Sequence, residues 1–411
     1  MSGGCARRRR PGPGPGVAGE NLGPPGAQPW LRHNTPGGTD EIEGRPDARP
    51  PAEKTPAQRL LAWVRRRWLL ILVLLIFVIF VILQLGNIRR FVETLVRGRI
   101  EWLAVAILLQ VAYYSAYAVL YQVSFETVEV ESQVLELVPV LFASIFLKVV
   151  VPSGGVSAVA VFVDDATRRG QSAARAAEGS LLVLVADLVT TVPLVALGLA
   201  FLQTQNALEL YQIIVAVLFV LFAGAVGGVL LLGRLQPDRL RAVLTRVQAT
   251  VNDLAARFRR PPLLPDDWAE RNAAECIGAA CNIAAHPRPL TRAFTVAFIA
   301  HLINVASLLA VALAYREPLP LGAVVAAFSL NVVFSVITII PHGIGVAEGV
   351  MALVFISLGV ATATSLVIAV AFRGLNLWIP LAIGFLLLYR VPAFGGVSWP
   401  SRQQGESESK R

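Results

Sequence analysis

The fold is decided by residues 321–358, which read LGAVVAAFSLNVVFSVITIIPHGIGVAEGVMALVFISL. The apolar run breaks at Pro341-His-Gly-Ile-Gly345, and about 14 apolar residues follow before Gly359. Fourteen helical residues reach roughly 21 Å, which is too short to cross a bilayer. A broken backbone at membrane depth survives only inside protein or beside water. The pattern therefore predicts a helix that enters the membrane and turns back.

The rest of the chain has the same apolar character. Hydrophobic residues make up 55% and charged residues 15% of the 411 residues, whereas a soluble domain carries roughly 25% charged residues. Runs with no more than two ionic residues inside them cover 68–88, 102–125, 137–163, 179–208, 210–233, 293–315 and 318–389. The 21 residues of 68–88 would rise roughly 31 Å, about one hydrocarbon thickness. We predict an all-α polytopic membrane protein with about seven spanning helices and two re-entrant hairpins broken by Pro and Gly.

The first of the two breaks lies at Pro152-Ser-Gly-Gly155, and eight apolar residues follow it. Pro152 and Pro341 are 189 residues apart. The same offset pairs Gly154 with Gly343, Gly170 with Gly359 and Asp187 with Asn376. Paired broken helices in two halves of a chain indicate a transport site near the membrane midplane. We therefore expect an inverted internal repeat.

Charge and composition suggest five segments. They are a disordered Pro/Gly/Arg-rich tail (1–60), a first membrane half (61–233), a cytoplasmic helical linker (234–292), a second membrane half (293–391) and a cytoplasmic tail (392–411). Arginines at 65–67 precede the first span and favour cytoplasmic termini. The four arginines within 86–99 oppose this topology, which places that loop outside.

Ionisable residues inside spans cost roughly 2.5–3.5 kcal/mol each at the helix centre and usually mark a pathway or a pair. By depth, Lys148 should lie near Asp187, and Glu348 near Arg373. Two interpretations stay open. The pairs either lock the broken helices or contact the headgroup of a substrate.

The breaks themselves are candidate anion sites. Gly154, Gly155, Gly343 and Gly345 would leave free backbone N–H groups at half-helix N-termini, which attract phosphate. The alternative is a kink needed only for packing. His342 lies inside the second break, and Asn376 is a candidate hydrogen-bonding group between helices.

Several classes of function are not supported. All but three of the 36 basic residues are Arg, but no basic face interleaved with aromatics points to nucleic acid. Cys276 and Cys281 are five residues apart, a poor zinc pattern, so we expect no metal and no cofactor. Asp164-Asp165 is followed by Arg168-Arg169 and is interpreted as a polar cap. No sequence motif of a hydrolase or nucleotide-binding enzyme is found.

The linker 234–292 predicts two helices. Apolar residues from Leu240 to Leu254 recur at helical spacing, with arginines among them. Such a helix either touches anionic headgroups or packs on the floor of the bundle. It could also bind a membrane or cytoplasmic enzyme.

The second break also carries a resemblance. Pro341-His-Gly-Ile-Gly-Val-Ala-Glu348 is similar to the Pro-x-Pro-Gly-Gly-x-Gly-x-x-Glu motif of the lysylphosphatidylglycerol synthase transmembrane region family of flippase-like proteins. Arg373, Trp378, Pro380 and Gly384 resemble its closing helix, and the resemblance covers roughly 65–390. It implies a multi-pass protein of the prokaryotic plasma (inner) membrane that moves a lipid or lipid-linked sugar between leaflets. Only about 20 residues follow Arg390, so the soluble synthase activity is not expected.

Three hypotheses result. In the first, the protein translocates an anionic phospholipid or a polyprenyl-phosphate-linked glycolipid. Lys148 and Arg373 then compensate the phosphate charge, while Asp187 and Glu348 hold these bases when the site is empty or couple a proton. In the second, it is a non-transporting subunit that positions an envelope lipid or glycan biosynthesis enzyme through 234–292. In the third, it is an intramembrane transferase.

Overall fold

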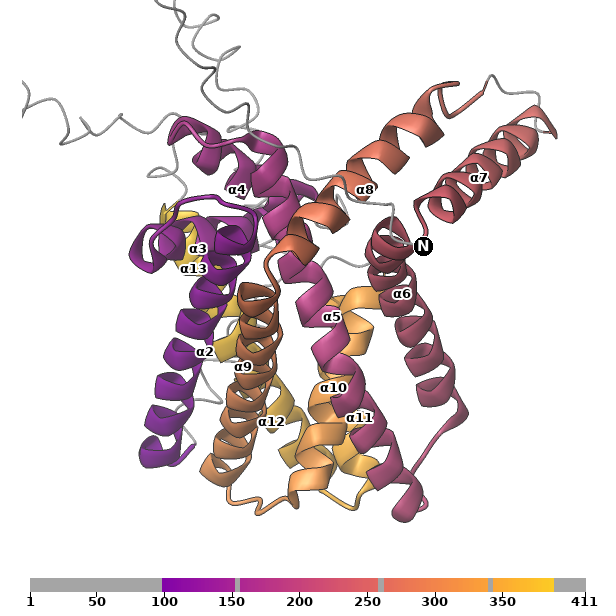
Figure 1. Cartoon of the computed structure of the whole chain (residues 1–411). Coiled ribbons are helices and arrows are strands. Elements are labelled where there is room, and N and C mark those ends of the chain that lie inside the picture. Colours follow the sequence, from indigo (N-terminus) through magenta and orange to yellow (C-terminus); the bar gives the residue numbers. More distant parts are fainter. Residues whose placement is uncertain (1–97, 152–155, 258–261, 339–342, 388–411) are drawn as a thin grey trace, which may run out of the picture. The chain divides into compact units, whose positions relative to one another are not determined.

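The computed structural model describes residues 98–151, 156–257, 262–338 and 343–387, and this part of the chain is helical without a strand (Figure 1). The helices are α2 (Ile100–Thr127), α3 (Val134–Val150), α4 (Val156–Arg168), α5 (Ala173–Thr204), α6 (Leu210–Leu235), α7 (Pro237–Arg257), α8 (Trp268–Ala285), α9 (Pro287–Ala314), α10 (Leu321–Ile337), α11 (Val346–Ser357), α12 (Thr362–Arg373), the π-helix η2 (Gly374–Trp378) and α13 (Ile379–Leu387). The all-α prediction is confirmed.

Five helices in the described residues are long and apolar enough to cross a membrane. They are α2, α5, α6, α9 and the continuous helix 362–387 that α12, η2 and α13 form. The expected span 68–88 and the expected tails lie outside the described residues. The figure of about seven spans is therefore not confirmed.

The helices that follow the two breaks are short. α4 has 13 residues and α11 has 12, which correspond to roughly 20 and 18 Å of helix. Each packs against the helix before its break, α4 on α3 and α11 on α10. Gly343 and Gly345 have φ of +63° and +86°, a backbone conformation that only glycine adopts without strain, so the second break has a defined shape. Re-entry into the membrane remains a prediction.

The structure confirms the internal repeat. Shifted by 189 residues, the starts of α2, α3, α4 and α5 fall within two residues of the starts of α9, α10, α11 and α12. Gly170 and Gly359, which follow the two short helices, have φ of +77° and +88°. Partners are also exchanged between the halves, because α5 packs on α10 and α13 packs on α3.

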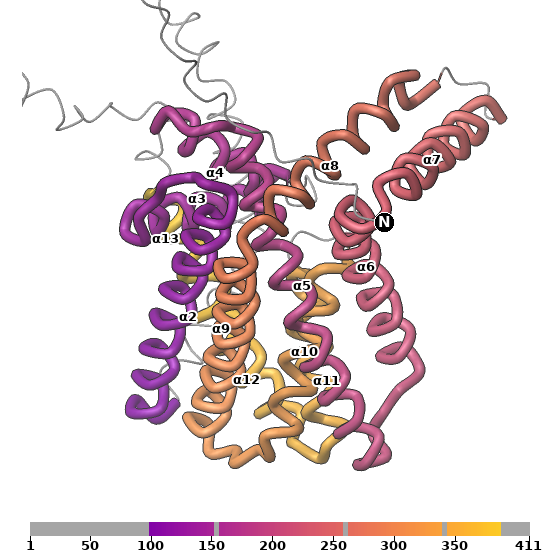
Figure 2. The backbone as a smooth tube through the Cα atoms, viewed as in Figure 1, coloured from indigo at the N-terminus to yellow at the C-terminus, as the bar shows by residue number. Residues whose placement is uncertain are grey.

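The two halves run in opposite directions. α2 and α9 lie side by side and antiparallel, as Figure 2 shows. The Arg99 N–H donates to the Ala314 carbonyl (2.9 Å) at one end, and Arg292 pairs with Glu126 (3.4 Å) at the other. Because α2 and α9 are equivalent in the repeat, their antiparallel packing makes the repeat inverted.

Two helix crossings between the halves depend on glycine. A Cβ at Gly384 of α13 would lie 2.9 Å from the carbonyl carbon of Phe142 in α3. A Cβ at Gly198 of α5 would lie 2.8 Å from the Cα of Ala326 in α10. Small residues at such crossings let the backbones approach, which is how helices associate where lipid removes the hydrophobic driving force.

Candidate functional site

A buried ion pair lies beside the second break. Arg373 ends α12 and is 1% exposed, and its Nε lies 2.9 Å from Oε1 of Glu348 in the first turn of α11. Oε2 of the same carboxylate accepts the Gly345 N–H (2.6 Å) and so caps the start of α11. Glu348 therefore ties the closing helix to the break. The pairing expected from depth is confirmed for these two residues.

An amide cluster lies where α2, α9 and η2 meet. Nε2 of Gln110 donates to Oδ1 of Asn304 and to the hydroxyl of Ser307, both at 2.9 Å. Nδ2 of Asn376 donates to Oδ1 of Asn304 (3.1 Å) and Oε1 of Gln110 (3.3 Å). The Tyr114 hydroxyl donates to the backbone carbonyl of Asn376 (2.6 Å) within the π-helical turn η2. Such turns occur often at functional sites.

A third group surrounds Asp187 of α5. The Tyr117 hydroxyl donates to its Oδ1, and Nε2 of His301 lies 3.4 Å from the same oxygen. His301 is 4% exposed and is held by the Thr191 hydroxyl at 3.0 Å. The prediction that Lys148 pairs with Asp187 was wrong. Lys148 is exposed on α3, and no ion pair between described residues includes Lys148. Asp187 is 25% exposed, so it remains accessible.

α2 links the amide cluster to the group around Asp187 through hydrogen bonds, and its Tyr114 lies near enough to Arg373 to interact with it electrostatically. Gln110, Tyr114, Tyr117 and Tyr121 recur every three to four residues and share one face of the helix. The ring centroid of Tyr113 lies 4.9 Å from that of Tyr114 and 5.2 Å from that of Tyr117, so Tyr113 contacts both rings. The polar track, as we name it, comprises Gln110, Tyr113, Tyr114, Tyr117, Asp187, His301, Asn304, Asn376, Glu348 and Arg373. From Gln110 to Tyr117 it extends roughly 10 Å along the axis of α2, about a third of the hydrocarbon thickness.

An apolar pocket of about 290 Å³ borders the polar track. Its lining comes from α2, α3, η2 and α13, namely Ile107, Gln110, Val111, Tyr114, Ser115, Val138, Phe142, Leu375, Ile379, Pro380 and Ile383. Ile107 and Val111 are 46% and 61% exposed on the outer surface of α2. Gln110 and Tyr114 belong both to this lining and to the polar track. The pocket thus joins the lipid-facing surface of the bundle to its polar interior.

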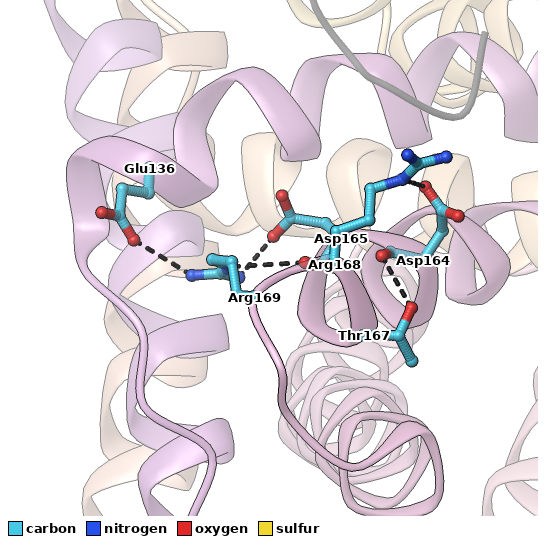
Figure 3. Close-up of polar contacts among 6 residues, drawn as sticks. All are labelled: Glu136, Asp164, Asp165, Thr167, Arg168 and Arg169. Atoms are coloured by element: carbon cyan, nitrogen blue, oxygen red, sulfur yellow. Dashed lines mark hydrogen bonds and ion pairs between the residues drawn. The ribbon is translucent and has the colours of Figure 1, made fainter. Parts of the chain in front are cut away.

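Charged residues at the end of α4 form a separate cluster (Figure 3). Arg169 bridges Asp165 and Glu136 at the start of α3, the latter at 3.0 Å, while Arg168 pairs with Asp164 at 2.8 Å. Burial raises the pKa of Asp165 and outweighs the opposing effect of Arg169. The two acids are thus engaged by neighbouring arginines, which fits a polar cap that fastens α4 to α3.

The remaining predicted site residues divide into two sets. Gly154, Gly155 and His342 lie outside the described residues. Gly343 and Gly345 form the described part of the second break, and Asn376 lies in the amide cluster. Gln110, Tyr114 and Tyr117 were missed, although a tyrosine and glutamine face at helical spacing in an otherwise apolar span was visible in the sequence.

Comparison with known proteins gives one match. The model of the family described as the lysylphosphatidylglycerol synthase TM region matches residues 68–384. No curated protein and no solved structure matches the chain. The matched range contains both breaks, the ion pair and the whole polar track. The chain therefore belongs to the lysylphosphatidylglycerol synthase TM region family.

Proposed function

We propose that this protein translocates an anionic phospholipid or a polyprenyl-phosphate-linked glycolipid between the leaflets of a prokaryotic inner membrane. The observation that supports the proposal is the contact between the polar track and the lipid-facing pocket, which share Gln110 and Tyr114. A charged group in hydrocarbon costs several kcal/mol, and flipping a lipid requires an alternative to that environment. Hydroxyls and amides along the polar track offer this alternative.

Arg373 is the charge that would meet a phosphate. In the structure, Glu348 neutralises it and accepts the hydrogen bond from its Nε. A lipid phosphate is a bidentate acceptor that competes well for a guanidinium. In the proposed cycle the phosphate replaces Glu348 on Arg373, and the freed carboxylate still caps Gly345.

The apolar pocket would take the first part of an acyl or prenyl chain. Its volume of about 290 Å³ lies at the lower end of the range for small-molecule sites. The rest of the chain would stay in the bilayer, because Ile107 and Val111 open the pocket towards lipid. The headgroup would then move along the polar track while the chain remains in an apolar environment.

The test is leaflet exchange of fluorescent lipids in proteoliposomes, followed by bleaching of the outer leaflet. Phosphatidylglycerol and polyprenyl-phosphate reporters are compared for the wild type, Glu348→Gln and Arg373→Ala. Glu126→Gln is the matched control, since it removes an exposed carboxylate from the Arg292 pair at the bundle surface. We expect the wild type and Glu126→Gln to speed exchange and the two site variants to lose it while still folded. Exchange at the wild-type rate in folded Glu348→Gln and Arg373→Ala would overturn the proposal.

Two added measurements separate translocation from the transferase and subunit alternatives. A transferase would form product in detergent, where no leaflets exist, and a non-transporting subunit would move no reporter and would co-purify with an enzyme. We therefore pair the exchange assay with product analysis in detergent.

A further inference from the structure

α7 presents an apolar face that no described helix covers. Val243, Val247 and Leu254 are 43%, 43% and 54% exposed, and their spacing places them in one line along the helix. Thr250 lies on the same line between them and is also exposed. These four residues are named the outer stripe.

A different side of α7 is used for packing and loop anchoring. Leu240 and Ala255 are buried, and Asn252 receives the N–H groups of Leu263 and Leu264 at 3.1 and 3.0 Å. Gln248 donates to the Pro265 carbonyl (2.7 Å) and accepts the Ala269 N–H (3.1 Å). α7 and α8 therefore form a hairpin with a fixed orientation, and the outer stripe is not a missing part of its core.

Three arginines follow one edge of the outer stripe. Arg239, Arg246 and Arg257 are exposed, and none of the ion pairs between described residues includes them. The fourth arginine of α7, Arg241, lies on another side and pairs with Asp238 at 3.2 Å. An apolar line bordered by unpaired arginines is the pattern of a helix that lies in an anionic membrane interface.

The position of α7 along the chain places it beside the membrane. α6 is a spanning helix of 26 residues, which corresponds to roughly 39 Å and exceeds the hydrocarbon thickness of about 30 Å. Gln236 alone separates α6 from α7. The first turn of α7 must therefore lie at the depth of the lipid headgroups, within reach of their phosphates.

We propose that α7 docks its outer stripe on the anionic surface of the bilayer, with Arg239, Arg246 and Arg257 on lipid phosphates. Val243, Val247 and Leu254 enter the boundary between headgroups and acyl chains. Docking of α7 on the bilayer does not require translocation. The α7–α8 hairpin would then bind the membrane surface according to its content of anionic lipid.

The experiment places an environment-sensitive fluorescent amino acid, dansylalanine, at position 247 or 245 of the full-length protein. Thr245 is exposed on the side of α7 away from the outer stripe and serves as the matched control. Each protein is reconstituted into nanodiscs of phosphatidylcholine alone or with phosphatidylglycerol, with and without brominated acyl chains.

We expect a blue shift and bromine quenching at position 247 only in discs that contain phosphatidylglycerol, and neither effect at position 245. The triple variant Arg239→Gln, Arg246→Gln, Arg257→Gln keeps the outer stripe and should abolish the response at 247. Each arginine removed should lower the ratio of docked to free α7 roughly fivefold. Equal emission at 247 in both compositions, or a response that survives the triple substitution, would overturn the proposal.

Discussion

Glu348→Gln should strongly destabilise the protein, because it leaves the buried charge of Arg373 without a counter-ion. Arg373 is 1% exposed, whereas the carboxylate of Glu348 is 16% exposed and contacts Nε at 2.9 Å. Gln has nearly the same shape and keeps an oxygen that can accept the Gly345 N–H, so the cap of α11 survives. The substitution removes the negative charge, and it also places the amide NH2, a donor, opposite the Nε–H of Arg373, so that this hydrogen bond is lost.

The size of the effect follows from burial. Removing one partner of a buried ion pair costs about 3–5 kcal/mol, because the other charge stays uncompensated. The exposed pair of Glu126 and Arg292, with side chains 53% and 61% exposed, should contribute only about 0–1 kcal/mol. Glu126→Gln is thus the same chemical change at a site where it should have little effect.

A double-mutant cycle isolates the charge. The free energy of unfolding is measured by steric trapping in bicelles for the wild type, Glu348→Gln, Arg373→Gln and the double variant. We expect the double variant to be more stable than Glu348→Gln, because no unpaired charge remains, with a coupling energy of about 2 kcal/mol or more. Additive losses, or a loss for Glu348→Gln no larger than for Glu126→Gln, would refute the reasoning.

Three further predictions concern packing, hydrogen bonding and pH. Gly384→Ala should lower the free energy of unfolding by about 1–3 kcal/mol, because its Cβ would meet the backbone of α3. The Cβ of Gly228→Ala in α6 would meet nothing within 4 Å, so this variant should be neutral or stabilising. Thermal melting in detergent compares the two variants. Tyr117→Phe and Asp187→Asn should each destabilise by about 1–3 kcal/mol, and together by less than their sum, as measured by steric trapping. Burial raises the pKa of Asp165 above 3.8, so the stability that its proton provides is present below that pH and lost as the pH rises through the raised value. The melting temperature of Asp165→Asn relative to the wild type should therefore increase with pH across this range.

Each of these has a contrary outcome. Equal melting temperatures for Gly384→Ala and Gly228→Ala would exclude the close approach of α13 to α3. Strict additivity of Tyr117→Phe and Asp187→Asn would mean that the two side chains do not interact. A melting difference for Asp165→Asn that stays flat or falls as the pH rises would contradict the direction of its pKa shift.

The sequence predicted the features that depend only on position along the chain. Hydropathy and helix length predicted the five spanning helices that the described residues contain, although the expected total was about seven. The 189-residue offset predicted the repeat, because both signals run along the chain. Glu348 and Arg373 could be paired because a single short turn separates α11 from α12, which limits where the two side chains can go.

The sequence did not predict which side of each helix faces its neighbours. Lys148 was expected beside Asp187 by depth, yet packing turns Lys148 outwards and gives Asp187 the hydroxyl of Tyr117 instead. Similar depth does not make two residues neighbours, because helix packing sets the face that each one presents. The π-helical turn that receives the Tyr114 hydroxyl likewise depends on tertiary contacts, and no residue pattern in the sequence predicted it.

The Glu348–Arg373 pair occurs in one half of the repeat only, and this sets an energetic bias. The corresponding positions in the first half, 189 residues earlier, are Val159 and Leu184. Two identical halves that exchanged conformations would produce degenerate states, equally populated on either side of the membrane. One ion pair removes that degeneracy, and a difference of about 1.4 kcal/mol already makes one state tenfold more abundant. In the proposed translocation cycle, this pair would favour one of the two conformations as the resting state.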